Sequence, residues 1–310
     1  MANITAKDVA ALRAKTGLGM MDCKKALVEA DGDMDKAVQI LREKGLATAA
    51  KKESRIAAEG IVDILVKGDI AAIIEVNTET DFVAKNESFK AFVKEVLETI
   101  IEKKPASLEA LMATEVVGAS TTVEAALVEK IAVIGEKISI RRFEIVEGTL
   151  ATYIHGAGTT GVIVKFATSA DVAGNDKFAE FAKNIALQLA AGNPPEYVNI
   201  EDVPAAAVEA EKAVLIAQAK NDPKNANKPE NILEKMVSGR LGKFYERVCL
   251  VEQAYVKDDD LTVGKYVAAT AKEIGVDIKI VSFVLFEKGE GIQKREENFA
   301  EEIAKLAGQK

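Results

Sequence analysis

The sequence of 310 residues contains no tryptophan, a single histidine and two cysteines. Metal sites and acid–base catalysis draw heavily on histidine and cysteine side chains, so both have little to use here. Cys23 and Cys249 lie far apart in the sequence and lack the paired spacing of a metal or redox motif. We therefore predict a protein without a metal or a cofactor, in which both thiols are reduced. The composition disfavours an enzyme but does not exclude one.

Long apolar runs are also absent. No apolar stretch approaches the roughly 18 residues that a helix needs to cross a bilayer, and no charged start followed by an apolar segment indicates a signal peptide. Acidic residues outnumber basic ones, 49 to 41, which gives a net charge of −8. Such a charge repels nucleic-acid phosphates and anionic lipids. We expect a soluble cytoplasmic protein that contacts neither nucleic acid nor membrane directly.

The first 45 residues have the pattern of three short helices. Thr5 and Asp8 have the spacing of a capping box before the first helix. Gly17 and Gly19 separate the first helix from the second, and an Asp-Gly pair at 31–32 separates the second from the third. The alanine-rich, basic stretch that follows indicates a connecting helix or a linker.

From residue 60 the apolar pattern changes to that of strands. Two strands joined by a turn at 67–69 precede a helix with a buried apolar stripe, and the same order returns downstream. The residues that match after an offset of 89 are Asn86 and Asn175, Phe89 and Phe178, Phe92 and Phe181, and Lys94 and Lys183. We infer two copies of one α+β unit, with a further strand at 138–146 between them.

The C-terminal part combines helices with further strands. Two helices flank the polar stretch NDPKNANKP, which predicts a helical hairpin of coiled-coil type. A strand at 248–256, a capped helix, another strand and a closing helix are expected to follow. The chain is thus predicted to be of the α+β class with mostly antiparallel sheets. The expected domains are a three-helix domain at 1–55, core subdomains at 56–147 and 148–288, the second with the hairpin at about 200–238, and a C-terminal helical module at 289–310.

A glycine-rich loop contains Gly156, Gly158 and Gly161 in a literal GxGxxG pattern, directly after His155. A dinucleotide site requires such a loop to open a helix, whereas a strand pattern follows here. We interpret the glycines as a hairpin turn with positive φ values and His155 as a turn or interface residue. An oxidoreductase that uses this loop to bind NAD is kept as a rival function.

The stretch EVNTETDFVAKNESF places two of its acids, Glu79 and Asp81, beside Phe82 in the pattern of a loop. We expect Glu79 and Asp81 to alternate along an extended segment and point to opposite sides, which disfavours an acid–base pair or a shared metal site. Phe82 has Asp171 as its counterpart in the second copy, so the fold does not demand the aromatic side chain. Phe82 is either a wedge that enters a partner protein or a core residue that caps the next helix.

Several motifs occur in a specific order along the chain: ITAKDVAALRAKTGLGMMDCKKAL, EVNTETDFVAKNESF, KISIRR, YIHG, EKMVSGRLGKF and FEKGEGI. In this order they closely resemble the bacterial translation elongation factor Ts family across nearly the whole chain. The family is the guanine-nucleotide exchange factor of elongation factor Tu. The resemblance therefore implies a ubiquitin-associated-like three-helix domain, a two-part core, a helical hairpin and a C-terminal module, without catalytic activity.

The resemblance also implies partners and site residues. GDP-bound and nucleotide-free Tu are the implied partners, and the helical hairpin offers a surface for self-association. The element that displaces magnesium from the Tu nucleotide site falls on Thr80, Asp81, Phe82 and Val83. Further Tu contacts are implied for Arg13, Met20, Met21, Ile134, Gly135, His155, Met236 and Val237.

Two positions depart from the family pattern. Thr78 stands where the family often has cysteine, and Thr159 and Thr160 stand where it often has a basic residue. The second departure leaves one contact with Tu undetermined. A ubiquitin-associated-like scaffold that binds Tu without changing GDP release is the other rival function.

Overall fold

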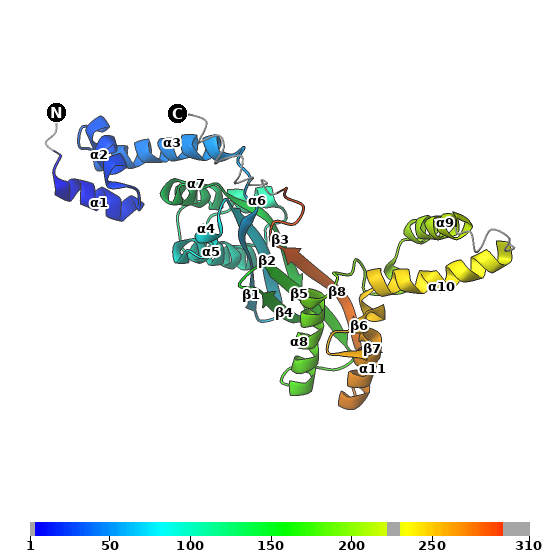
Figure 1. Cartoon of the computed structure of the whole chain (residues 1–310). Coiled ribbons are helices and arrows are strands. Elements are labelled where there is room, and N and C mark those ends of the chain that lie inside the picture. The colour runs from blue at the N-terminus through cyan, green and yellow to red at the C-terminus, as the bar shows by residue number, and fades with distance from the viewer. Residues whose placement is uncertain (1–3, 222–229, 294–310) are drawn as a thin grey trace. The chain divides into compact units, whose positions relative to one another are not determined.

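The computed structural model describes residues 4–221 and 230–293 (Figure 1). Its contacts divide the chain into two compact units. The first unit comprises Met1–Asp63, Ile74–Phe143 and Glu287–Lys310, and the second comprises Ile64–Ile73 and Glu144–Phe286. The domain boundaries drawn from the sequence stay predictions. The polar turn of the helical hairpin and the expected closing helix lie outside the described residues.

Three helices begin the first unit: α1 (Ala6–Thr16), α2 (Met20–Glu29) and α3 (Met34–Lys52). The capping box forms as expected, because the backbone N–H of Asp8 donates to Thr5 Oγ1 and the N–H of Thr5 donates to the Asp8 carboxylate. The stretch after Gly45, expected as a connecting helix or linker, continues α3 to its end. Tertiary packing outweighs the low helix propensity of glycine here, since Gly45 faces Val128 and Ala132.

The first sheet has the strand order β1 (Glu59–Lys67), β2 (Ile70–Thr78) and β3 (Ile138–Glu147). The intervening helices are α4 (Asp81–Ala84), α5 (Glu87–Lys103), α6 (Leu108–Ala113) and α7 (Val123–Ile134). Asn86 caps α5, whose expected apolar stripe is buried, including Phe89 and Phe92. The short connection from β2 to α5 contains α4, which therefore lies at the end of a buried strand.

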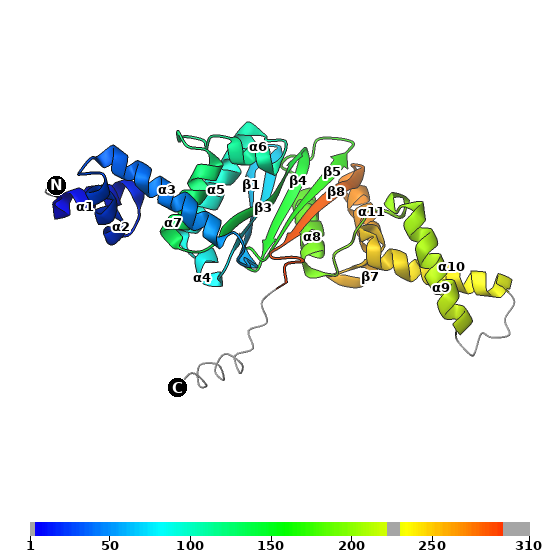
Figure 2. The same cartoon turned by 90° about the horizontal axis from the view of Figure 1, so that it is seen from above.

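The second unit repeats this order with β4 (Thr149–His155), β5 (Thr160–Thr168), α8 (Asp176–Ala191), α11 (Val263–Ile274) and β8 (Ile278–Glu287). The sheet order is β4-β5-β8, and β4 pairs with β5 in antiparallel register (Figure 2). Asn175 caps α8 as Asn86 caps α5. Phe166, Phe178 and Phe181 pack together in the core between sheet and helices.

The duplication extends further than the sequence pattern suggested. Helix α7 and strand β3 correspond to α11 and β8 at a constant offset of 140, because Val123 matches Val263 and Ile138 matches Ile278 (263 − 123 = 278 − 138 = 140). In both copies a glycine with positive φ ends the helix, Gly135 in the first and Gly275 in the second. Each copy is thus a strand hairpin, a helix, a second helix and a third strand.

Helices α9 (Ala205–Asn221) and α10 (Glu230–Val248) form the arms of the predicted hairpin and share an apolar cluster that includes Leu215 and Phe244. The strand expected at 248–256 is wrong. That stretch forms a 3-10 helix, η3 (Leu250–Glu252), and the two-residue strand β6 (Ala254–Tyr255), which pairs with β7 (Asp258–Thr262). The backbone N–H groups of Glu252 and Gln253 donate to the carbonyls of Cys249 and Leu250, three residues earlier, and these bonds form the 3-10 turn in place of a strand. Among the described residues, the helices are too short or too polar to span a membrane.

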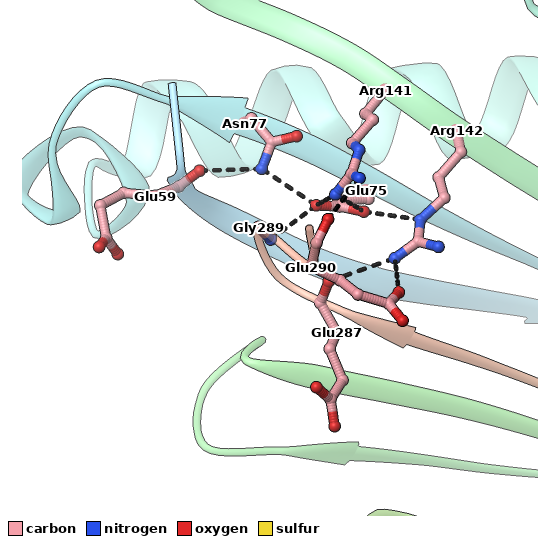
Figure 3. Close-up of polar contacts among 8 residues, drawn as sticks. All are labelled: Glu59, Glu75, Asn77, Arg141, Arg142, Glu287, Gly289 and Glu290. Atoms are coloured by element: carbon pink, nitrogen blue, oxygen red, sulfur yellow. Dashed lines mark hydrogen bonds and ion pairs between the residues drawn. The ribbon is translucent and has the colours of Figure 1, made fainter. Parts of the chain in front are cut away.

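A buried carboxylate joins three segments of the first unit (Figure 3). Glu75 on β2 is fully buried and pairs with two arginines of β3, at 3.0 Å from Arg141 Nη1 and 2.7 Å from Arg142 Nε. Asn77 Nδ2 and the N–H of Gly289 also donate to Glu75 Oε1. Every polar donor around the carboxylate therefore comes from β2, β3 or the segment after β8.

The same cluster holds the segment that follows β8. The guanidinium of Arg142 donates to Glu290 Oε2 at 2.8 Å and to the carbonyl of Glu287 at 3.2 Å. Arg141 donates to the carbonyl of Glu290. Gly289 has a φ of +71°, and a Cβ there would lie 2.4 Å from the carbonyl oxygen of Ala58, so only glycine fits this approach. Burial alone would raise the pKa of Glu75, but these hydrogen bonds outweigh it and hold the pKa below its ordinary value.

We predict that Glu75→Gln lowers the free energy of unfolding at neutral pH by about 3–5 kcal/mol, because two partly buried arginines lose the buried anion with which they pair. A carboxylate with a depressed folded-state pKa contributes stability above its unfolded pKa of about 4.3 and loses it as the pH falls through the folded value. The wild type should therefore lose stability below about pH 4, and Glu75→Gln should lose less over the same range. Chemical denaturation at several pH values measures both effects.

The matched control is Glu144→Gln, which changes an exposed glutamate of β3. It should leave both the neutral stability and the acid dependence close to those of the wild type. An acid dependence of Glu75→Gln as steep as that of the wild type would contradict the role of the Glu75 carboxylate.

Candidate functional site

Helix α4 presents one aromatic side chain to solvent. Phe82 is 80% exposed, whereas the next two residues, Val83 and Ala84, are 8% and 7% exposed and anchor the turn in the core. The core interpretation of Phe82 is therefore wrong. The structure instead places the ring on an anchored surface turn, where a partner can reach it.

The turn is attached to a second loop through Thr80, the N-cap residue of α4. The Thr80 hydroxyl donates to Glu136 Oε1 at 2.7 Å, and its backbone N–H donates to Glu136 Oε2 at 3.0 Å. Glu136 follows Gly135, which ends α7 with a φ of +84°. The segment predicted to lie near the wedge, Ile134 and Gly135, is thus brought next to Thr80, with Ile134 partly buried and Gly135 exposed.

Glu79 and Asp81 face different partners. Glu79 accepts from the N–H of Lys137 at 2.6 Å and from Arg55 Nη1 at 3.2 Å. Asp81 pairs with Lys85 one helical turn later, at 2.6 Å. The expected extended segment is wrong, because Asp81 already begins a helix. The conclusion that the two acids do not form a shared catalytic or metal pair is nevertheless compatible with this geometry.

Asp81 carries a negative charge at neutral pH. The hydrogen bond from Lys85 lowers the pKa of the Asp81 carboxyl, and slight desolvation opposes it only in part. The side chain is about half exposed. The site therefore places the exposed ring of Phe82 next to the negatively charged carboxylate of Asp81.

The remaining candidates in the first unit lie on the three-helix part. Arg13 on α1 is exposed, and Met20 and Met21 begin α2 with 59% and 62% of their side chains exposed. Methionine side chains are flexible and polarisable, which suits an adaptable protein contact. These residues form an exposed surface of mixed charge and apolar character.

In the second unit, His155 is exposed at the end of β4, with Nδ1 3.3 Å from the hydroxyl of Tyr153. The glycine-rich loop after it joins β4 to β5 through Gly156 and Gly158, whose φ values are +57° and +96°. The hairpin interpretation is confirmed for Gly156 and Gly158, whereas Gly161 lies within β5 and lacks a positive φ. The dinucleotide interpretation is wrong, because the loop leads into a strand and supplies no helix N-terminus for a pyrophosphate. Thr159 is exposed in this turn, and its hydroxyl donates to the carbonyl of His155.

Helix α10 carries the last two candidates. Met236 is partly buried, and Val237 is 4% exposed within the cluster shared by α9 and α10. The Val237 side chain therefore packs inside the hairpin. Among residues 4–221 and 230–293, no cluster of three or more metal-ligating side chains occurs.

Sequence reasoning missed three residues that hold the α4 turn: Arg55, Glu136 and Lys137. Glu136 lies 56 residues from Thr80 and Lys137 lies 58 residues from Glu79. No local pattern reports contacts at such separations. The one available signal is that Glu136 and Lys137 directly follow Ile134 and Gly135.

Comparisons with known proteins identify relatives of this chain. A family model described as Elongation factor TS matches residues 79–290. Elongation factor Ts of Clostridioides difficile (strain 630) is 51% identical over 309 residues, which cover 98% of this chain and 99% of the relative. Proteins of the same name from Clostridium perfringens (strain SM101 / Type A) and Syntrophotalea carbinolica are 48% and 46% identical, with the same coverage.

These comparisons confirm the resemblance drawn from the sequence motifs. The family model begins at Glu79, directly before α4, and ends at Glu290, within the segment that the Glu75 cluster holds. The relatives match from end to end at about half of all positions. The chain belongs to the elongation factor Ts family.

Proposed function

We propose that this protein is a guanine-nucleotide exchange factor that binds elongation factor Tu and promotes the release of GDP, so that GTP can bind during translation elongation. Family membership supports this proposal. The observation that carries it is the exposure of Phe82 on an anchored turn. Aromatic side chains that enter a partner's pocket commonly dominate the binding energy of an interface.

Exchange of this kind requires no covalent chemistry. The factor binds nucleotide-free Tu more tightly than GDP-bound Tu, and thermodynamic linkage then makes it weaken GDP by the same factor. Differential binding is sufficient, which agrees with the shortage of histidine and cysteine in the sequence. The protein therefore acts as a non-catalytic factor whose effect depends on the shape and charge of its surface.

We assign the disturbance of the Tu magnesium site to Thr80, Asp81, Phe82 and Val83. Mg²⁺ requires near-ideal octahedral coordination, so a small displacement of the Tu loop that supports it is costly. Phe82 supplies an apolar group for insertion, Asp81 supplies a charge beside it, and buried Val83 anchors the turn. In the proposed element, each of these three adjacent residues therefore has a different role.

Further contacts with Tu are proposed for the other exposed candidates. Arg13, Met20 and Met21 form a docking surface, and Gly135 and His155 add contacts elsewhere. Val237 is buried, so its contribution is to hold α10 in place.

The decisive experiment follows fluorescent GDP leaving Tu by stopped flow, with and without this protein. The proposal expects a faster release that saturates with protein concentration. A scaffold without exchange activity would bind Tu and leave the release rate unchanged, and that result would overturn the proposal.

We predict that Phe82→Ala weakens the complex with nucleotide-free Tu by about 2 kcal/mol or more, roughly thirtyfold in Kd, because an interface anchor is lost. The isolated variant should melt like the wild type, since the ring is exposed. Titration calorimetry and thermal melts measure the two effects. Phe92→Ala is the contrasting control: it truncates a buried ring and should destabilise the free protein by about 3–5 kcal/mol. A Phe82→Ala variant with unchanged affinity would contradict the wedge.

Asp81→Ala should slow GDP release chiefly when magnesium is present, because its proposed effect is on the surroundings of the ion. The release rate is measured in magnesium and in excess chelator. Lys85→Ala is the matched control, since it removes the same ion pair while leaving the Asp81 carboxylate in place. A defect of equal size in both media would leave Asp81 with a general binding role only.

We also expect the double substitution Met20→Ser and Met21→Ser to raise the concentration of protein needed for half-maximal exchange more than it lowers the saturated rate. Docking residues contribute mainly to affinity. Val28→Ser changes a residue of α2 that is similarly exposed at 57% and serves as the control. A double variant with wild-type half-saturation would refute the docking surface.

A further inference from the structure

Helix α4 does not have the means to hold its own shape. It has four residues, and helices of this length are unstable alone because nucleation is unfavourable. A threonine at an N-cap ordinarily accepts a hydrogen bond from the first turn with its side chain. In Thr80 the hydroxyl is turned to Glu136 instead. The position of the turn that carries Phe82 therefore depends on contacts from another part of the chain.

Glu136 supplies these contacts with both carboxylate oxygens. One oxygen accepts from the Thr80 hydroxyl at 2.7 Å and the other accepts from the Thr80 N–H at 3.0 Å. Hydrogen bonds to an ionised carboxylate are roughly twice as strong as neutral ones. The two bonds fix both the side chain and the backbone of Thr80, which leaves α4 little freedom to rotate about its N-cap residue.

A parallel contact runs through the neighbouring residues. The N–H of Lys137 donates to Glu79 at 2.6 Å, so two consecutive residues of one loop bind two consecutive residues of the other. Lys137 Nζ also donates to the carbonyls of Glu53 and Arg55, at 2.6 and 2.8 Å. The residues that directly follow α3 are thereby bound to the loop that contains Glu136 and Lys137.

The second copy shows which of these contacts the fold itself needs. At the offset of 140, Val276 and Asp277 occupy the positions of Glu136 and Lys137. Ser169 is the counterpart of Thr80 at the offset of 89 (80 + 89 = 169) and exchanges two hydrogen bonds with Asp277. The N–H of Ser169 donates to the Asp277 carbonyl at 3.0 Å, and the N–H of Asp277 donates to Ser169 Oγ at 2.9 Å. Val276, the counterpart of Glu136, packs against the core. A carboxylate at this position is thus dispensable for the fold and occurs where the exposed aromatic occurs.

We propose that Glu136 is a positioning residue for exchange: it holds α4 so that Phe82 and Asp81 are presented to Tu in one geometry. The inference rests on the proposed function. A group that is already ordered before binding loses less conformational entropy when it binds. If α4 is displaced, the protein would still bind Tu through the docking surface. Phe82 and Asp81 would then disturb the nucleotide site of Tu less.

The test compares Glu136→Ala, which removes both hydrogen bonds, with Glu136→Gln, which keeps one acceptor for the Thr80 N–H and can donate to its hydroxyl. Asp202→Ala is the matched control, because Asp202 likewise binds the N–H and the side chain of one residue, Asn199, at 2.8 and 3.0 Å in the second unit. Thermal melts of the full-length variants show whether each remains folded. Thr80→Val removes the hydroxyl bond alone and provides a second variant.

Two measurements are made on each protein. Hydrogen exchange of the isolated protein reports protection of the amides from Thr80 to Asn86, and stopped-flow GDP release from Tu reports the saturated rate and the half-saturation concentration. Glu136→Ala should lose protection in this segment and lower the saturated rate about tenfold, which corresponds to the loss of roughly one charge-assisted hydrogen bond. The defect should be larger in magnesium than in chelator. Glu136→Gln should restore most of the rate, Thr80→Val should lie between, and Asp202→Ala should match the wild type.

The outcomes separate the two proposals. A wild-type protein that leaves GDP release unchanged would overturn the proposed function, whatever the variants do. An active wild type with Glu136→Ala equal to it would overturn the role of Glu136 alone, as would a rate loss without any loss of protection in α4. A loss of protection confined to this segment, joined to a lower saturated rate that Glu136→Gln restores, supports the proposal.

Discussion

A carboxylate without access to water organises the first unit. Removing Glu75 from solvent is costly, and the cost is offset only when donors from β2, β3 and the segment after β8 surround it. These stretches are far apart in the sequence, so the charge is satisfied only in the complete arrangement. The same strand that carries Glu75 ends three residues later and leads directly into α4. The buried cluster thus fixes the strand from which the exposed turn extends.

The two copies of the duplicated unit can be compared to separate residues that the fold requires from residues that we propose for function. Both copies use a capped helix after the strand hairpin and a glycine-terminated helix before the third strand. They differ at Phe82 and at Glu136, whose counterparts are Asp171 and Val276. Because the second copy folds without the aromatic and without the carboxylate, neither is a requirement of the architecture. The differences between the copies therefore lie at the turn for which we propose a contact with Tu.

A protein that acts by differential binding needs few reactive groups and a well-ordered surface. Both cysteines are buried, and desolvation raises the pKa of the Cys249 thiol to about 11, which keeps it protonated and unreactive. The ionisable groups near α4 instead make contacts that hold the turn: Asp81 pairs with Lys85, and Glu136 accepts two hydrogen bonds from Thr80. Order at α4 comes from such contacts and from buried neighbours. These polar contacts keep the surface around α4 ordered. The proposed exchange function requires such order, because linkage between Tu binding and GDP release depends on how that surface contacts Tu.

The sequence by itself determined the class of the fold, most helices and strands, the duplication and the family. These features depend on local information: apolar periodicity, helix caps such as Thr5 and Asn86, and motifs of adjacent residues. It left open whether Phe82 was core or surface, predicted an extended segment where α4 forms, and assigned a strand at 248–256 where a 3-10 helix forms. The contact between Glu136 and Thr80 was not foreseen at all. Only the tertiary structure decided these points, because burial and hydrogen bonding at each depend on residues far away in the sequence, and such partners leave no local pattern.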